Sequence, residues 1–125
     1  MMSKMAEFPI TYHCKNLMSK MRFFIIHFPS MRANGMALFP FLLVKYKSPS
    51  KVLINHERIH FRQQIELLIL PFYIWYILEY LIHRLLGKSP NYAYRSISFE
   101  KEAYENDEDL GYLKRRKLWA FWKYI

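Results

Sequence analysis

The pentapeptide His56-Glu57-Arg58-Ile59-His60 constrains the fold of this chain more than any other stretch, because its chemistry requires one backbone conformation. Two histidines four residues apart lie about one turn apart on one face of an α-helix. From there both imidazoles can bind one zinc ion, and the glutamate after the first histidine can take a proton from a water molecule beside the metal. The spacing therefore predicts a helix that carries a zinc site.

The flanking residues favour such a helix from residue 51 to about residue 70. Ser48 or Ser50 can cap its first turn, and Pro49 is tolerated there. The face that holds both histidines is partly apolar and also carries Val52, Ile59, Gln63 and Leu67. A shielded metal site requires such a face, whereas the alternative, a merely solvated helix surface, does not.

A mostly apolar run of twenty residues, 67–86, is long enough to span a bilayer. Glu79 lies inside this run, and His83 and Arg84 lie near its end, which disfavours a span. We therefore expect a buried core helix that packs behind the histidine helix. A helix docked on a membrane surface is the second interpretation, and a true span is the third.

Length and composition indicate one mainly α domain with a minor β part. The chain has 125 residues, of which 53% are hydrophobic and only 3 are glycine, so it is neither disordered nor turn-rich and all-β. Its single cysteine, Cys14, excludes cysteine-based zinc sites and fits the reducing cytoplasm.

The net charge of +9 predicts contact with an anionic surface. Because the aromatic residues lie mostly in apolar runs, a membrane surface suits this chain better than nucleic acid. Residues 112–125 predict a final basic aromatic helix that docks on the core or on a membrane. We therefore expect a cytoplasmic protein, either free or associated with a membrane.

The N-terminal part is predicted to be an extension, residues 1–35, before a domain of residues 36–125. Within the extension, residues 23–28 form a short apolar run ended by Pro29, which we interpret as a strand or tail rather than a signal peptide. The run 36–46 predicts a short edge strand, interrupted at Pro40 because proline cannot donate to a ladder.

A third metal ligand is expected from a later helix, because a catalytic zinc site usually has three protein ligands and one open position. His83 stands at the far end of the apolar run, where a surface position is expected. A polar helix predicted at 96–110 offers Glu100 on a half-apolar face and Glu102 on a polar face. We expect Glu100 as the ligand, with Glu102 as the alternative.

These motifs together resemble the gluzincin type of zinc metallopeptidase. The resemblance rests on the HERIH pentapeptide followed by Phe99-Glu100-Lys101-Glu102-Ala103, and residues 36–125 are similar to small bacterial zincin-like proteins. In that family a helical E-x-E-A-D follows the first motif, and its first glutamate binds zinc. The chain departs from the pattern at Tyr104, where the family has an aspartate that orients neighbouring groups.

The resemblance implies a zinc-dependent metallopeptidase that hydrolyses a peptide or protein substrate. Its metal ligands would be His56, His60 and Glu100, and Glu57 would be the general base that takes a proton from a zinc-activated water. Donors available to stabilise the oxyanion are Tyr92, Tyr94, Arg95 and Tyr104. Two alternatives are a non-catalytic helical module stabilised by zinc and a metal-free, basic, amphipathic protein of the membrane surface.

Overall fold

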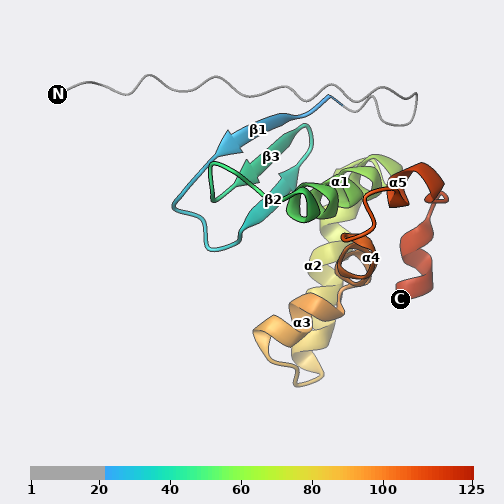
Figure 1. The fold of residues 1–125 in the computed structure, drawn as a ribbon. Coiled ribbons are helices and arrows are strands. Elements are labelled where there is room, and N and C mark those ends of the chain that lie inside the picture. Colours follow the sequence, from blue (N-terminus) through green and yellow to red (C-terminus); the bar gives the residue numbers. More distant parts are fainter. Residues whose placement is uncertain (1–21) are drawn as a thin grey trace.

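The computed structural model describes residues 22–125, which form a small sheet beside a group of helices (Figure 1). The helical elements are α1 (Lys51–Glu66), α2 (Leu70–Leu85), α3 (Pro90–Ser96), α4 (Ser98–Asn106), α5 (Tyr112–Arg115) and the 3-10 helix η1 (Ala120–Tyr124). The expectation of a mainly α fold with a minor β part is confirmed.

The sheet has three strands, β1 (Phe24–His27), β2 (Gly35–Leu38) and β3 (Phe41–Val44), in the order β1-β3-β2. β1 runs parallel to β3, and β2 runs antiparallel to it. The run 36–46 therefore holds two strands with Pro40 in the turn between them; β2 is at one edge of the sheet and β3 is the central strand. β1 pairs in the same sheet, although it lies within the predicted extension 1–35; residues 1–21 lie outside the described part.

Helix α1 forms where the histidine pattern predicted it. The Ser50 hydroxyl caps it by accepting a hydrogen bond from the Leu53 N–H. Its end comes earlier than predicted, because Leu68 and Ile69 adopt positive φ angles of 59° and 64°. The chain bends by 113° there and continues into α2.

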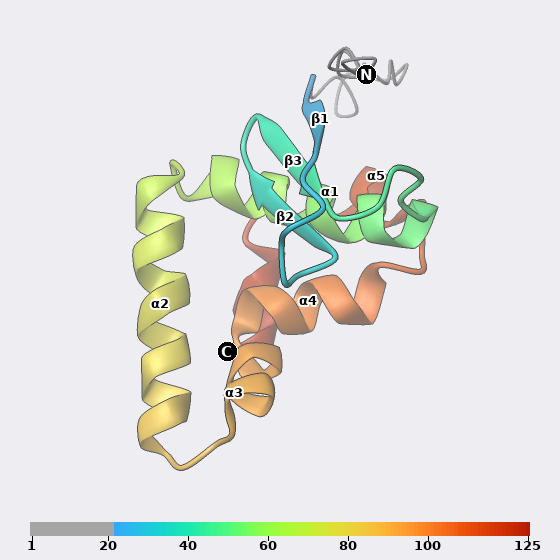
Figure 2. The same ribbon diagram turned by 90° about the vertical axis from the view of Figure 1, so that its left-hand side faces the viewer.

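Helix α2 corrects one prediction. The run 67–86 was expected to be a buried core helix, but Phe72 is the one buried residue of α2. Its inner side packs on a core that contains Leu67, Phe72, Ile97, Phe99 and Phe121. Its outer side is uncovered, and α2 stands along one flank of the molecule in Figure 2.

A membrane span requires a minimum helix length and hydropathy. No single helix within residues 22–125 is both long and apolar enough to cross a membrane. Helices α1 and α2 reach the required length and composition only together, across the 113° bend.

The C-terminal third differs from its predicted helices. The polar helix expected at 96–110 forms as α4 but is shorter: Ile97 is extended (φ −60°, ψ 133°), so the helix begins at Ser98, and it ends at Asn106. The single helix expected at 112–125 is wrong: α5 and η1 are short and separated by Trp119 in the left-handed region. This irregular path carries Arg116 and Phe121 into the interior.

Candidate metal centre

Helix α1 presents His56 and His60 one turn apart, and both are buried. Its neighbour Asn55 docks α1 against the end of α4. The Asn55 amide donates to the backbone carbonyls of Asn106, Asp107 and Asp109, at 3.4, 2.9 and 3.0 Å. The Asn106 and Asp109 carbonyls also accept backbone hydrogen bonds from the Asp109 and Tyr112 N–H groups, so Asn55 ties α1 to the turn that follows α4.

Helix α4 brings Glu100 to the two histidines. Glu79 of α2 holds the beginning of α4, since its carboxylate accepts hydrogen bonds from the Ser98 N–H (2.6 Å) and hydroxyl (2.8 Å). A carboxylate at a helix N-terminus is favourable for both hydrogen bonding and the helix dipole. Glu79 therefore has a structural role that explains its place in the apolar run.

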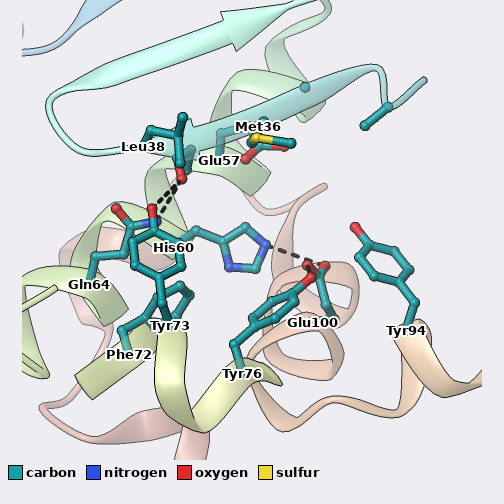
Figure 3. Close-up of a pocket in the computed structure, with 13 residues that line it drawn as sticks. Met36, Leu38, Glu57, His60, Gln64, Phe72, Tyr73, Tyr76, Tyr94 and Glu100 are labelled. Atoms are coloured by element: carbon teal, nitrogen blue, oxygen red, sulfur yellow. Dashed lines mark hydrogen bonds and ion pairs between the residues drawn. The ribbon is translucent and has the colours of Figure 1, made fainter. Parts of the chain in front are cut away.

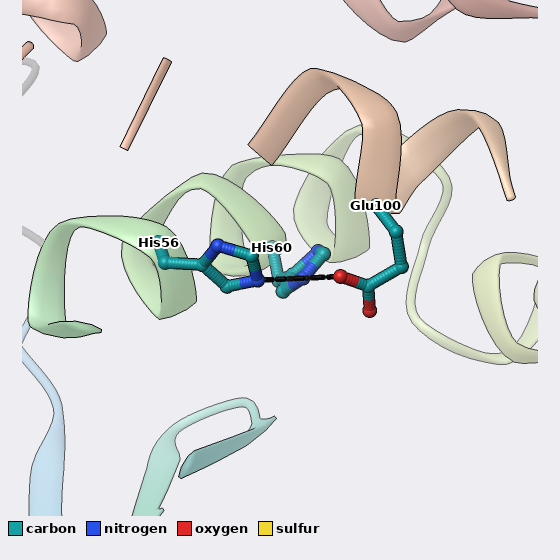
Figure 4. A group of neighbouring side chains, drawn as sticks. All are labelled: His56, His60 and Glu100. Atoms are coloured by element: carbon teal, nitrogen blue, oxygen red, sulfur yellow. Dashed lines mark hydrogen bonds and ion pairs between the residues drawn. The ribbon is translucent and has the colours of Figure 1, made fainter. Parts of the chain in front are cut away.

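The side chains of His56, His60 and Glu100 converge from these two helices (Figure 4). The two Nε2 atoms lie 3.2 Å apart, and Glu100 Oε2 lies 3.2 Å from His56 Nε2 and 3.3 Å from His60 Nε2. All three residues are buried, and together they could hold a metal ion.

The surrounding hydrogen bonds fix the tautomer of His60. The Gln63 amide nitrogen donates to the Glu102 carboxylate (2.8 Å) and to the Phe99 carbonyl (3.2 Å), two groups that only accept. The Gln63 oxygen must then face His60 Nδ1, 2.8 Å away, which therefore carries the proton. In the neutral ring Nε2 then has the lone pair, and this nitrogen faces Glu100.

Asp107 fixes the tautomer of His56 in the same way. Its carboxylate lies 3.1 Å from His56 Nδ1, so this nitrogen donates and Nε2 keeps its lone pair. Tyr104, which replaces the aspartate of the resembled family, packs edge-on against the His56 ring with centroids 4.5 Å apart. The Asp107 carboxylate, three residues after Tyr104, thus orients the His56 ring by a hydrogen bond that Tyr104 does not make.

The centre therefore gathers three electron-pair donors that need a cation between them. Without a metal, burial opposes a proton on His60, but the Glu100 and Glu57 carboxylates and the hydrogen bonds of Glu100 and Gln63 outweigh burial and raise the pKa of His60 to about 9. Burial alone would raise the pKa of Glu100, but both imidazoles and the Tyr76 hydroxyl (2.7 Å) hold it well below its usual range.

Glu57 lies beside this centre but outside the group of three. It is buried, and burial raises the pKa of its carboxyl group, although the two imidazoles act in the opposite direction. The Ala37 N–H of β2 is hydrogen-bonded to it. A Cβ on Gly35 would come within 2.9 Å of Glu57 Oε1, so glycine allows β2 to approach α1 this closely.

A cavity of about 200 Å³ opens next to Glu57, His60 and Glu100 (Figure 3). Its wall is largely apolar and aromatic and includes Met36, Leu38, Phe72, Tyr73, Tyr76 and Tyr94. Along one side the Ala37 carbonyl accepts hydrogen bonds from Gln64 (2.8 Å) and Tyr73 (3.1 Å). The edge of β2 is thus tied to α1 and α2 at this point.

The four predicted oxyanion donors occupy different places. Tyr94 lines the cavity, and burial together with the Glu100 carboxylate raises its pKa, so its hydroxyl keeps a proton to donate. Tyr104 and Arg95 line a second cavity of about 460 Å³, which shares Glu57 and Tyr94 with the first. Tyr92 is exposed and lines neither cavity.

The expected solvent position of Glu102 is wrong. Its side chain is fully buried and paired with Arg116, which also binds Glu66. Glu102 is outside the group of three and reaches His60 only through Gln63. Sequence reasoning missed the contacts of Asp107, Glu79 and Arg116, whereas Gln63 was at least placed on the histidine face.

Comparisons with models of protein families, with curated proteins and with solved structures found no match for this chain. The resemblance to gluzincins therefore stays a prediction.

Proposed function

We propose that this chain is a zinc-dependent metallopeptidase. The observation that supports the proposal best is the convergence of one ligand atom each from His56, His60 and Glu100 in a buried site beside the carboxyl group of Glu57, which is outside that group of three. Two imidazoles and one glutamate are the ligand set of a known class of catalytic zinc sites.

The spacing of the donor atoms is compatible with zinc. In a tetrahedral site with bonds of about 2.0–2.1 Å, neighbouring ligand atoms are about 3.3 Å apart. The three donor–donor distances here are 3.2, 3.2 and 3.3 Å. Because Asp107 and Gln63 hold the outer nitrogens of the two rings, the ligands need little rearrangement to accept the ion.

Zinc, when bound, would supply Lewis acidity and make a nearby water more acidic. Glu57 would take a proton of that water while the water oxygen attacks the carbonyl carbon of the substrate, and it would deliver the proton to the amine as the C–N bond breaks. Its buried position, which raises the pKa of its carboxyl group, suits a base that must also release the proton. The Tyr94 hydroxyl would donate a hydrogen bond to the developing oxyanion. The aromatic cavity would receive one apolar side chain of the substrate and exclude water around it.

The test compares Glu57→Gln with wild type for zinc content and for cleavage of a mixed peptide pool. We expect the variant to keep one zinc per chain and to lose activity by about 10²–10⁴-fold, because the amide cannot accept the proton. Glu105→Gln is the matched control, since Glu105 is an exposed carboxylate of α4. It should retain both zinc and activity.

The outcomes separate the three interpretations. Undiminished cleavage by Glu57→Gln would show that the mechanism is wrong. Stoichiometric zinc in the wild type without cleavage of any peptide would favour the non-catalytic module stabilised by zinc. Wild-type protein that cannot be loaded with zinc would leave the metal-free, membrane-surface interpretation.

A further inference from the structure

The outer side of α2 carries an apolar surface that the fold does not cover. Ile74, Ile77, Leu78, Leu81, Ile82 and Leu85 recur at helical spacing, and each is between 49% and 87% exposed. We call these six residues the outer face of α2. They extend along about 17 Å of helix axis. Exposed apolar surfaces this continuous mark an interaction site in a folded protein.

The polar residues of α2 point elsewhere. Glu79 is bonded to Ser98 and to Trp75, His83 contacts Lys88, and Arg84 donates to the Lys88 carbonyl. The outer face therefore contains no group that needs a hydrogen-bonding partner. A hydrocarbon phase satisfies such a surface without any specific contact.

The C-terminal segment extends this surface and adds charge. Trp75 of α2 lies against Trp122, with ring centroids 5.6 Å apart, and Trp122 is 59% exposed. The exposed Trp119 and Trp122 lie between two exposed lysines, Lys117 and Lys123. Tryptophan beside lysine next to an aliphatic helix face is the composition of segments that lie at the headgroup level of a bilayer.

From these observations we infer that the protein docks on an anionic membrane surface, with α2 lying in the interface and its outer face in the acyl region. The net charge of +9 favours this partner, because anionic headgroups attract basic segments at the surface. A second copy of the chain would bring the same positive charge against the first, so charge opposes self-association through this surface.

Docking in this orientation leaves the metal centre accessible. The inner side of α2 contributes Phe72, Tyr73 and Tyr76 to the smaller cavity, so α2 would lie between the bilayer and the centre (Figure 2). The larger cavity, which His56 and Glu57 line, has no α2 residue in its lining. The inference does not depend on zinc or on catalysis.

Flotation with lipid vesicles tests it directly. Wild-type protein is mixed with vesicles of phosphatidylcholine and phosphatidylglycerol, or of phosphatidylcholine alone, with and without added zinc. We expect flotation with the anionic vesicles, weakened by salt, and the same result in both metal states. The variant Ile77→Asn with Leu81→Asn should bind about tenfold more weakly or worse, because two apolar side chains no longer enter the bilayer.

The matched control replaces Phe28 and Tyr46, exposed residues beside the sheet, by asparagine and should bind like wild type. Circular dichroism checks that both variants fold. Independently of any variant, tryptophan emission of the wild type should be quenched by brominated lipids.

Three results would overturn the inference. Wild-type protein that stays unbound at low salt would do so, as would an α2 variant that floats like wild type. The third is a wild-type dimer that ignores vesicles and dissociates in the α2 variant, since the outer face would then belong to a second copy of the chain.

Discussion

Two glutamates of α4, Glu100 and Glu102, are equally deep in the molecule but have different partners. Glu102 is paired with the Arg116 guanidinium and also accepts hydrogen bonds from Tyr112 (2.8 Å) and Gln63 (2.8 Å). Glu100 faces two imidazole nitrogens and a phenol. A buried carboxylate is costly unless a cation compensates it. The cation of Glu102 is part of the chain, whereas that of Glu100 must be a metal ion or a proton.

This difference separates a structural ion pair from a site that can bind a metal ion. In both clusters the outer hydrogen bonds are satisfied by the protein, so what differs is the charge at the centre. Gln63 connects the two, since it donates to Glu102 and accepts from His60. The ion pair of Glu102 can therefore hold the ligand His60 in the orientation that a metal needs.

The largest expected effect comes from removing the Arg116 guanidinium, the cation that the chain itself supplies to Glu102. Arg116→Met should lower the free energy of unfolding by about 3–5 kcal/mol, because Glu102 and Glu66 would be left buried without their partner. Urea denaturation followed by circular dichroism measures the loss.

Arg115→Met is the control for that variant. Arg115 is exposed and paired with the exposed Asp109, so its removal should cost less than about 1 kcal/mol. Equal losses in the two variants would contradict the assignment of Arg116 as the compensating cation.

The cluster of His56, His60 and Glu100 should instead be stabilised by zinc. At zinc concentrations about a hundredfold above its Kd, the free energy of unfolding should rise by about 2.7 kcal/mol in the wild type. Glu100→Gln should lose most of this gain, because a neutral amide is a poor ligand for zinc. The measurement is urea denaturation with zinc and with a chelator.

Glu105→Gln, on the exposed side of the same helix, should keep the full gain. Zinc that stabilises Glu100→Gln as strongly as the wild type would mean that the ion binds elsewhere in the chain.

The sequence was most informative where function depends on local spacing. The histidine pair lies on α1 as its four-residue interval requires, and the half-apolar face of Glu100 does turn toward that pair. Glu102 shares its helix face with polar residues, so the pattern predicts exposure, yet the side chain is buried. It is buried because Arg116, fourteen residues later, enters the core along an irregular path and pairs with it, and helical periodicity cannot detect such a partner.

Two further features were hidden for other physical reasons. Asp107 follows the end of α4 and reaches His56 only because the chain turns back along α1, which no helical period encodes. In α2 both sides are hydrophobic, so a hydrophobicity pattern does not tell the packed side from the exposed one. The chemical difference is subtler: the inner side is mostly aromatic, with Phe72 and Tyr76, and the outer side is aliphatic.

A smaller effect is expected from the residues that orient the two imidazoles. Asp107→Ala should weaken zinc binding about 10- to 100-fold, or about 1.4–2.7 kcal/mol, and leave the metal-free stability nearly unchanged. Gln63→Ala should weaken zinc binding similarly but also destabilise the metal-free protein, because Gln63 belongs to both clusters. Competition with a chromophoric chelator measures the affinities.

Asp109→Ala removes an exposed carboxylate near Asp107 and should leave zinc affinity unchanged. If Gln63→Ala changed zinc affinity without any change in metal-free stability, the proposed link between the clusters would be wrong.

The smallest expected effect is a dependence on pH. The cluster of Glu100 should take up and release a proton at His60, whereas the cluster of Glu102 should not. In the metal-free protein burial lowers the pKa of His60, but Glu100, Glu57 and Gln63 outweigh it and raise the pKa from 6.5 to about 9. The proton therefore stabilises the metal-free fold fully below pH 6.5, and this contribution is lost as the pH rises through about 9. Zinc must displace the same proton from the folded protein, so its apparent affinity should rise with pH up to about 9 and then level off.

Calorimetric titration of zinc in buffers of different ionisation enthalpy counts the protons released. Near neutral pH we expect about one proton per zinc from His60, because zinc and a proton compete for the same Nε2 lone pair. The Arg116→Met variant leaves His60 and Glu100 intact, so any zinc that it binds should release the same proton. Zinc uptake without proton release would mean that His60 is already neutral and that Glu100 tolerates burial without a cation. The contrast between the two glutamates would then have no electrostatic basis.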